Sequence, residues 1–319
     1  MKTSVIIPNY MGKEVLQKCL TSLNCVGEDI EVVISDDSSG ENIEKTIEDS
    51  GLNKPYKIVR RYVNEGFSPA INSGVDVSDG NYLVFLNNDA RVEKGWLTYL
   101  VQSLETSEDV GAVQSLILKE DGKIDCLGGR VDELGFPHEI GRGERIVEHP
   151  VPSVIDYTKA ASIIIRRSDY EDFDRFDESF FLGYESVDLC WRMRNKDKVM
   201  IFDPRSLVYH VSRHASSRVS PPKRWYHATK NHLLTFLRNS HDVQLKTGMD
   251  NVLGIRAGQI SHHSENGYFD TAHAIYDGVY YAYSIADHYM GLSPRIGTNT
   301  QDEVKRKMHT FLKEVKLPV

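Results

Sequence analysis

The chain has 319 residues, of which 40% are hydrophobic and 26% charged, the composition of an ordinary globular protein. Its formal net charge of -8 argues against a dedicated nucleic-acid binder. No stretch approaches the roughly 18 apolar residues of a membrane span, and the N-terminal apolar run is too short for a signal peptide. We therefore expect a cytoplasmic protein with reduced cysteines, and peripheral contact with the inner face of the membrane is left open.

The first hundred residues alternate between short apolar runs and amphipathic helical patterns. Alternation of this kind, with strands that are apolar along their length, predicts a mostly parallel sheet covered by helices on both faces. Within the third helical pattern, Ser68 is the expected N-cap and Pro69 the first helical residue. The predicted strands are 4–8, 30–37, 56–62 and 81–89, and the helical patterns cover 12–23, 40–51, 66–80 and 93–107.

The pattern changes after residue 119. Residues 121–144 are rich in glycine and indicate hairpins or loops. The segment "SSRVSPP" suggests a domain boundary, so we expect an α/β domain over residues 1–215 and a helical C-terminal region over 216–319. Further strands are predicted at 161–167, 199–204 and 206–212, and further helices at 180–194, 223–239, 272–289 and 301–315.

A long segment near the predicted boundary carries no acidic residue. Between Arg205 and His241 there is no Asp or Glu, whereas seven Lys or Arg residues and five histidines occur. One interpretation is a solvated basic face. The other is a surface for a local anionic partner, such as a diphosphate or a phospholipid surface.

The segment "FLNNDA", residues 85–90, ends a predicted strand in three polar residues. Ligands of parallel sheets bind beyond the carboxyl ends of the strands, where Asn87, Asn88 and Asp89 are expected to lie. Their amide and carboxylate oxygens suit Mg²⁺ or Mn²⁺. The same triplet is also a good turn signal. Because the other predicted strands end in equally polar residues, the metal-site interpretation is strengthened.

Two carboxylates stand three residues apart in "FFLGYESVDLCWRMR". Glu185 and Asp188 are predicted to share one face of a helix whose start is anchored by the preceding apolar run. This spacing alone is compatible with an active site and with ordinary helix surface chemistry, including an ion pair from Asp188 to Arg192.

Six segments stand together in an order and spacing that resemble the family 2 glycosyltransferases. They are "SVIIPNY", "VVISDDSS", "NEGFSPAINSG", "YLVFLNNDA", "RFDESFFLGYESVDLCWR" and "SLVYHVS", and the resemblance covers residues 3 to about 215. The chain is most similar to the rhamnosyltransferase-like subgroup, in which an Asn-Asn-Asp or similar triplet replaces an Asp-x-Asp motif. The resemblance implies a GT-A fold, followed here by C-terminal helices, and transfer of a sugar from a nucleotide diphosphate with inversion.

The resemblance also implies residues that bind the donor. Pro8 and Tyr10 would flank the nucleobase, and Asp36 would accept a hydrogen bond from a pyrimidine or the ribose. Gly66 would let the backbone approach the donor closely. The other residues implied at the donor are Asn64, Asn72, Asn88 and Arg213. Arg213, together with His214, would close over the diphosphate.

A divalent cation, Mn²⁺ or Mg²⁺, is implied at the diphosphate. The resemblance assigns it to Asp89, with Asn87 nearby, and His210 in "SLVYHVS" matches a position that often supplies a third ligand. As a lone histidine near a strand, His210 is equally compatible with a structural role. The ion would act as a Lewis acid toward the leaving group.

The catalytic base is the point at which this sequence departs from the family. The base is usually the Asp directly after the Glu of a Glu-Asp-x-Asp-Leu segment, and that position is Ser186 here. A serine cannot act as a base at neutral pH, so Glu185 or Asp188 is left for the role, and we favour Glu185. The alternative is a nucleotide-sugar-binding protein with impaired turnover.

The predicted activity is therefore transfer from a UDP- or dTDP-sugar to a hydroxyl of a glycan, polysaccharide or glycolipid. A sugar nucleotidyltransferase is disfavoured because the first strand is not followed by a Gly-rich loop with several basic residues. The helical C-terminal region has two interpretations: packing against the catalytic domain, or acceptor recognition, homodimer formation or membrane docking. Its tyrosines, with Trp225 and Tyr226, would suit an aromatic interface.

Overall fold

The structure is a computed structural model that describes residues 2–147, 150–211 and 218–317. The chain divides into two compact units. Unit 1 is Met1–Arg130, His138–Phe181 and Leu189–Ser217, and unit 2 is Val131–Pro137, Leu182–Asp188 and Arg218–Val319. The boundary predicted between residues 215 and 216 lies outside the described residues. Two short segments far upstream of it, 131–137 and 182–188, fall in unit 2.

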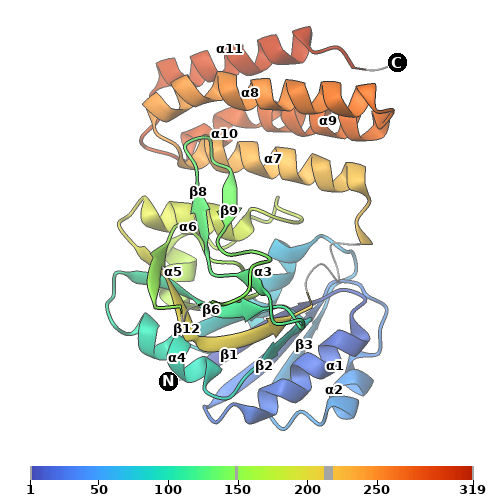
Figure 1. Ribbon diagram of the computed structural model, residues 1–319, viewed down its shortest axis with the longest axis vertical. Coiled ribbons are helices and arrows are strands. Elements are labelled where there is room, and N and C mark those ends of the chain that lie inside the picture. Colours follow the sequence, from blue (N-terminus) through green and yellow to red (C-terminus); the bar gives the residue numbers. More distant parts are fainter. Residues whose placement is uncertain (1, 148–149, 212–217, 318–319) are drawn as a thin grey trace. The chain divides into compact units, whose positions relative to one another are not determined.

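The main sheet has ten strands within the described residues (Figure 1). Eight of them lie in the order β10-β12-β6-β11-β4-β1-β2-β3, while β5 pairs with β12 and β7 with β6; β8 and β9 form a separate two-stranded sheet. The strands are β1 Thr3–Asn9, β2 Ile30–Asp36, β3 Tyr56–Arg60, β4 Tyr82–Leu86, β5 Ala90–Val92, β6 Val110–Leu118, β7 Ile124–Cys126, β8 Gly129–Val131, β9 Pro137–Glu139, β10 Ser153–Ile155, β11 Ser162–Arg166 and β12 Val199–His210.

The sheet is mixed. β1 runs parallel to β2 and β4, β2 is parallel to β3, and β6 is parallel to β12, whereas β11 is antiparallel to both β4 and β6. The two short strands expected at 199–204 and 206–212 are one strand, β12, with a register irregularity between Asp203 and Leu207. Because β12 continues past this irregularity, His210 is carried to the end of a strand that lies beside β6.

Helices begin and end close to the predicted positions. The helix expected to start at Ser68 begins at Phe67 instead, with Gly66 as its N-cap residue, and the Ser68 side chain is buried. The reason is that Gly66 adopts a φ of 101°, a backbone conformation that lets the helix begin there. The helices up to residue 194 are α1 Lys13–Ser22, η1 Leu23–Cys25, α2 Ile43–Ser50, α3 Phe67–Val77, α4 Trp96–Leu104, α5 Arg167–Asp172 and α6 Glu185–Arg194.

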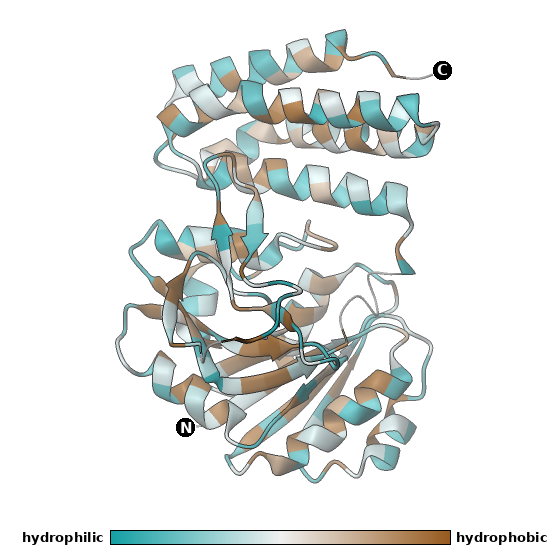
Figure 2. Ribbon diagram, in the orientation of Figure 1, coloured by the Kyte–Doolittle hydropathy of each residue, from teal (hydrophilic) through white to brown (hydrophobic). Residues whose placement is uncertain are grey.

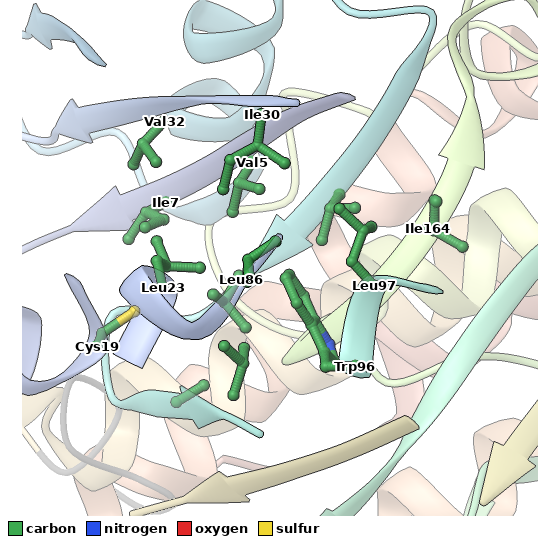
Figure 3. Packing of buried hydrophobic residues seen from close by; sticks show 14 of the residues in the cluster. Val5, Ile7, Cys19, Leu23, Ile30, Val32, Leu86, Trp96, Leu97 and Ile164 are labelled. Carbon is green, nitrogen blue, oxygen red and sulfur yellow. The ribbon is translucent and has the colours of Figure 1, made fainter. Parts of the chain in front are cut away.

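Alternate residues of the central strands pack on opposite faces of the sheet, as the pleat requires. Val5 and Ile7 of β1 belong to a buried cluster that also contains residues of α1, α2 and α4 (Figure 3). On the other face, Ile6 approaches Gly74 of α3, and Phe85 contacts the ring of Tyr170 of α5. The strands are accordingly hydrophobic along their length (Figure 2).

Unit 2 contains the C-terminal helices. They are α7 Pro221–Asn239, α8 Asp242–Glu265, α9 Phe269–Ser284, α10 Ala286–Gly291 and α11 Thr298–Glu314. α8, with 24 residues, was not anticipated from the sequence. Among the described residues, no helix combines the length and hydropathy needed to cross a membrane.

Candidate active site

Polar side chains meet at the carboxyl ends of β1, β2 and β4. Asn9 Nδ2 donates hydrogen bonds to Asp36 Oδ1 at 3.2 Å and to Glu41 Oε2 at 3.2 Å. Asn88 Nδ2 donates to Asn9 Oδ1 at 2.7 Å. Glu41 in turn accepts from the backbone N–H groups of Gly12 and Lys13 at the start of α1. Since the strands are parallel, their polar ends lie at one edge of the sheet, and Asp36 and Asn88 are joined there through Asn9.

Asp89 and His210 lie in contact although 121 residues separate them in the sequence. His210 Nε2 is 2.9 Å from Asp89 Oδ1, and Asn87 Nδ2 lies 3.1 Å from the same ring nitrogen. Both Asp89 and His210 are buried. β5, which follows Asp89, pairs with the end of β12 in the register Ala90↔His210, and this pairing brings the two side chains together.

The other ring nitrogen of His210 contacts a second carboxylate. Nδ1 lies 2.9 Å from Oδ2 of Asp125, which also lies 2.9 Å from Lys159 Nζ. Burial lowers the pKa of His210, but its hydrogen bonds with Asp125 and Asp89 outweigh burial and raise the pKa to about 9. Burial raises the pKa of Asp125, yet His210 and Lys159 hold it well below its ordinary range.

The Asp89–His210 pair offers a carboxylate oxygen and an imidazole nitrogen, two ligand types that divalent cations accept. Within the described ranges, no group of three or more His, Cys, Asp or Glu side chains is arranged to hold a metal ion. Two protein ligands are nonetheless usual where substrate phosphates and water supply the rest. Nε2 and Oδ1 are 2.9 Å apart, which is the length of the hydrogen bond that joins them here. The same spacing is close to the roughly 3 Å between neighbouring ligands of an octahedral ion with bonds of about 2.1 Å.

Gly66 does allow a close backbone approach, but in this structure the approaching group is the chain itself. A Cβ at Gly66 would lie 2.3 Å from the carbonyl oxygen of Phe181, and the Phe67 N–H donates to that oxygen. The Gly66 N–H donates to Asp37 Oδ2 at 2.9 Å. Gly66 therefore joins the start of α3 to the segment that leads toward Glu185.

The Asn72 side chain is occupied by protein groups. Its amide nitrogen donates to the Phe176 carbonyl and to Glu178 Oε1, and its oxygen accepts from the Tyr170 hydroxyl at 2.6 Å. These three bonds secure the loop after α5 on α3. The structure gives Asn72 a scaffold contact, and its implied role at the donor has no support from its surroundings.

The remaining donor residues implied by sequence are partly accessible or undescribed. Pro8, Tyr10 and Asn64 are each half-buried, as a residue that contacts a ligand needs to be. Arg213, like His214, lies outside the described residues. The basic segment is not one solvated face, because Lys230 and His232 are buried in unit 2.

In unit 2, Glu185 is the first residue of α6 and has an enclosed carboxyl group. Its Oε2 atom is buried and has no hydrogen-bond partner among the described residues. Burial raises the pKa of Glu185 to about 7, although backbone N–H groups of Glu185 and Gly183 oppose this shift. A carboxyl group with such a pKa can accept a proton near neutral pH.

The segment before Glu185 is held by α7. Asn231 Nδ2 donates to the carbonyls of Leu182 at 3.1 Å and Gly183 at 2.7 Å. Gly183 and Tyr184 have φ values of 81° and 73°, and Tyr184 thus occupies a left-handed conformation that is costly for a bulky residue. The Asn231 clamp helps to hold this strained turn, from which Glu185 starts the helix.

Asp188 has a different environment from Glu185. It is fully buried, accepts a hydrogen bond from Asn239 Nδ2 at 2.8 Å and lies 3.7 Å from Arg238 Nη1. These contacts fix the first turn of α6 to the end of α7. Ser186 is also buried.

Comparison with known proteins finds a family model that matches the N-terminal part of the chain. Residues 4–146, which contain β1 to β9, match the sequence model described as "Glycosyl transferase family 2". Residues 4–146, slightly under half of the chain, are thus similar to glycosyl transferase family 2, and we refer to them as the family 2 domain. The rhamnosyltransferase-like subgroup stays a prediction.

The family 2 domain has relatives of different lengths. The amylovoran biosynthesis glycosyltransferase AmsB of Erwinia amylovora is 27% identical over 268 residues, which cover 77% of this chain and 85% of AmsB. A pre-mycofactocin glycosyltransferase of Mycobacterium tuberculosis is 25% identical over 211 residues, 66% of this chain and 43% of that protein. The chain thus spans less than half the length of the latter relative.

Solved structures confirm the expected α/β GT-A fold class and the presence of helices in the C-terminal region of the chain. Staphylococcus aureus TarS 1-349 in complex with UDP-GlcNAc has a TM-score of 0.60 and 16% identity, with coverage of 98% of this chain and 91% of TarS. The mannosyltransferase PcManGT from Pyrobaculum calidifontis, in complex with GDP-Man and Mn²⁺, has a TM-score of 0.55 and 14% identity, with coverage of 98% and 87%. At these identities the likeness establishes the fold.

Sequence reasoning missed two residues that the structure places beside candidate site residues. Asp125 of the family 2 domain stands between Ile124 and Cys126, and an ionisable residue in an apolar strand was the signal available. Asn231 lies on a helix with several buried polar residues, and nothing in its sequence context pointed to the segment before Glu185.

Proposed function

We propose that the chain is a glycosyltransferase that moves a sugar from a nucleotide diphosphate donor to a hydroxyl group with inversion. The observation that carries the proposal is the Asp89–His210 contact at the sheet edge of a family 2 domain. The Asn9–Asp36–Asn88 network beside it supports a donor site at the same edge. TarS and PcManGT, solved with UDP-GlcNAc and GDP-Man, support a nucleotide-sugar donor.

The proposed reaction is one displacement. Glu185 takes the proton of the acceptor hydroxyl, the hydroxyl oxygen forms a bond to the anomeric carbon, and the bond from that carbon to the diphosphate oxygen breaks. The electron pair leaves with the nucleoside diphosphate. The raised pKa of Glu185 and its unpartnered Oε2 support this role, and general-base assistance is worth about 10²–10⁴-fold. Asp188 positions the helix through Asn239.

Asp89 and His210 would hold Mn²⁺ or Mg²⁺, with Asn87 beside them. The bound ion supplies Lewis-acid stabilisation of the charge that develops on the leaving diphosphate. The Mn²⁺ in the PcManGT complex supports a divalent cation. Asp36, Pro8 and Tyr10 would contact the nucleoside of a UDP- or dTDP-sugar.

The proposed acceptor is a glycan, polysaccharide or lipid-linked sugar. AmsB, whose name places it in amylovoran biosynthesis, supports a role in polysaccharide assembly. Under this proposal the chain works in the cytoplasm, with peripheral contact at the membrane where the acceptor is lipid-linked. A homodimer is a further proposal, which size-exclusion chromatography with light scattering tests.

A thermal-shift panel of UDP-, dTDP- and GDP-sugars, with and without Mn²⁺, tests donor binding. A ligand present at 100 times its dissociation constant adds about 2.7 kcal/mol to the free energy of unfolding, so one nucleotide should raise Tm clearly. Asp89→Ala should remove the Mn²⁺-dependent part, while Asp121→Ala, at an exposed loop position, should keep it. The metal assignment fails if Asp89→Ala retains Mn²⁺-dependent stabilisation.

A transfer assay separates turnover from binding alone. Glu185→Gln should lower the transfer rate by about 10²–10⁴-fold while donor binding is kept. Ser186, which replaces the usual base, favours a second candidate, a nucleotide-sugar-binding protein without efficient turnover. Donor binding without transfer by the wild type, together with transfer gained in Ser186→Asp, would favour that candidate.

A further inference from the structure

A chain of charged side chains in unit 1 passes through His210. His210 lies between Asp89 and Asp125, each 2.9 Å from one ring nitrogen. Asp125 is 2.9 Å from Lys159 Nζ, and Lys159 is 3.0 Å from Glu139 Oε1. The proposed function uses the Asp89 side of this chain. Asp125 and Lys159, which lie on the Nδ1 side of His210, have no role in the proposed function.

Strand register explains why Asp125 reaches His210. β7 pairs with β6 in antiparallel fashion, in the register Ile117↔Cys126 and Leu118↔Ile124. β6 also pairs with β12, in the register Leu118↔Tyr209. Asp125 therefore lies at the end of β6 beside the residue that follows Tyr209. Residues of three strands therefore build the contact, with an irregularity in the β6–β7 pairing at Asp125.

Burial of Asp125 is costly, and stability alone does not account for it. Its side chain is 0% exposed, and Oδ2 contacts both His210 and Lys159 while the buried Oδ1 has no hydrogen-bond partner among the described residues. A buried ion pair often stabilises a fold no better than apolar residues of the same size. The contact between Asp125 Oδ2 and His210 Nδ1 does fix the orientation of the His210 ring.

The orientation of His210 matters for a metal ligand. Where a metal ion takes the place of the Nε2 proton, Nδ1–H can still donate to a carboxylate, and the Nε2 lone pair then points away from that carboxylate. Here Nε2 points to Asp89. Without Asp125, the imidazole could rotate or exchange tautomers, and Nε2 would spend less time in position beside Asp89.

We propose that Asp125 is a positioning residue that fixes the His210 ring with Nε2 toward Asp89, and that Lys159 holds Asp125 in place. The inference rests on the divalent-cation site of the proposed function. It assigns a task to the hairpin region at 121–144, because β7 carries the carboxylate that orients a ligand on β12. Such outer partners typically change metal affinity by about 10–100-fold.

Mn²⁺ affinity of the full-length chain tests the proposal without any need for turnover. The electron paramagnetic resonance signal of free Mn²⁺ is titrated with wild type and variants, with and without UDP. Asp125→Leu should weaken Mn²⁺ binding by about 10–100-fold, Asp125→Asn, which keeps an acceptor oxygen, should weaken it less, and Asp89→Ala should abolish it. Asp203→Asn is the matched control, since Asp203 is a fully buried carboxylate of β12 that bonds Ser103 and Arg205.

Imidazole ¹H–¹⁵N spectra with Mg²⁺ give a second readout that a merely structural role would not change. Wild-type His210 should show the Nδ1–H tautomer, and Asp125→Leu should show a mixture of tautomers. If Asp125→Leu does not fold, Lys159→Met carries the affinity test, because the Lys159 side chain is partly exposed; the expected loss is then about tenfold.

Each outcome decides a separate point. If Asp125→Leu binds Mn²⁺ as tightly as wild type while Asp89→Ala does not bind, the positioning role is wrong and the proposed function stands. An equal loss in Asp203→Asn would mean that general destabilisation causes the effect, and this also overturns the inference. No Mn²⁺ binding by wild type, with or without UDP, removes the metal site of the proposed function and the inference together.

Discussion

Among single residues, Glu185, the proposed general base, carries a burial cost. Enclosure of its carboxyl group raises the pKa from 4.5 to about 7. The folded protein therefore binds this proton more tightly than the unfolded chain, and the free energy of unfolding falls as pH rises from about 4.5 to about 7. Destabilisation of this kind is expected where a residue is selected for activity.

Glu185→Gln should stabilise the protein at high pH. Glutamine carries no charge to bury, so the variant avoids the cost of burying the Glu185 carboxylate. The pKa shift sets this cost at up to about 3 kcal/mol at pH 8, or roughly 4 °C in Tm for a chain of this length. At pH 5 the native Glu185 is protonated, and the gain should shrink to less than about 1 kcal/mol. Scanning calorimetry at both pH values measures the difference.

The control for this prediction is Glu108→Gln, at an exposed position. It should change Tm equally, and only slightly, at pH 5 and pH 8. A Glu185→Gln variant whose Tm gain is the same at both pH values would show that the Glu185 carboxyl group is not enclosed in the folded protein.

At the scale of elements, α7 acts as a clamp on the segment that carries Glu185. Asn231 holds the Leu182 and Gly183 carbonyls, and Asn239 holds Asp188, eight residues further along the same helix. Asn231 and Asn239 are both buried. The carboxyl group of Glu185 is thus set by side chains of the C-terminal region.

Asn231→Ala should lower kcat for transfer by about tenfold or more while the donor KM changes little. Misplacement of a catalytic group by a small distance is enough for such a loss. Two partly buried carbonyls would also lose their donor, at a cost of up to about 1–3 kcal/mol. Steady-state kinetics with varied donor measures both constants.

Asn251→Ala provides the matched control for the clamp, because Asn251 is an exposed asparagine on α8. Its kcat and KM should equal those of the wild type. A donor KM that rises in Asn231→Ala with kcat unchanged would contradict the clamp and indicate a role in donor binding.

At the same scale, the sequence predicted which helices and strands exist better than it predicted where they begin and end and which elements they pack against. The strands β1, β2 and β4 were found because they are continuous apolar runs. α8 was missed because its three glycines and scattered apolar residues show no clear helical period. Its packing is tertiary: Phe136 lies 5.3 Å below the Arg256 guanidinium, within unit 2.

For the whole molecule, the division into units does not follow the order of the chain. The segment 131–137 belongs to unit 2, where Phe136 stacks on His232 of α7 with ring centroids 4.1 Å apart. His232 Nε2 lies 2.8 Å from the Leu134 carbonyl, and its Nδ1 lies 2.7 Å from Arg256 Nη2. Burial lowers the pKa of His232 to about 3, so this histidine is neutral and donates to the carbonyl through Nε2.

Phe136→Ala should therefore loosen the helical unit although residue 136 lies within the family 2 match. Hydrogen–deuterium exchange of the intact chain should become faster in α7 and α8 and stay unchanged in β1, β2 and β4. Loss of the aromatic stack costs about 0.5–1.5 kcal/mol beyond the buried area. Val154→Ala, an exposed position in unit 1, is the control. Faster exchange confined to the β-sheet would contradict the assignment of 131–137 to unit 2.

The sequence by itself determined the fold class and the polar strand ends, because apolar periodicity and turn chemistry are local properties of the chain. It identified Asp89, His210 and Glu185 as candidates by residue type and motif. Only the tertiary structure joined Asp125 to His210 and Asn231 to the Leu182 carbonyl. The reason is physical: these contacts join residues 85 and 49 positions apart, and they depend on the register of β6 between β7 and β12 and on the packing of α7.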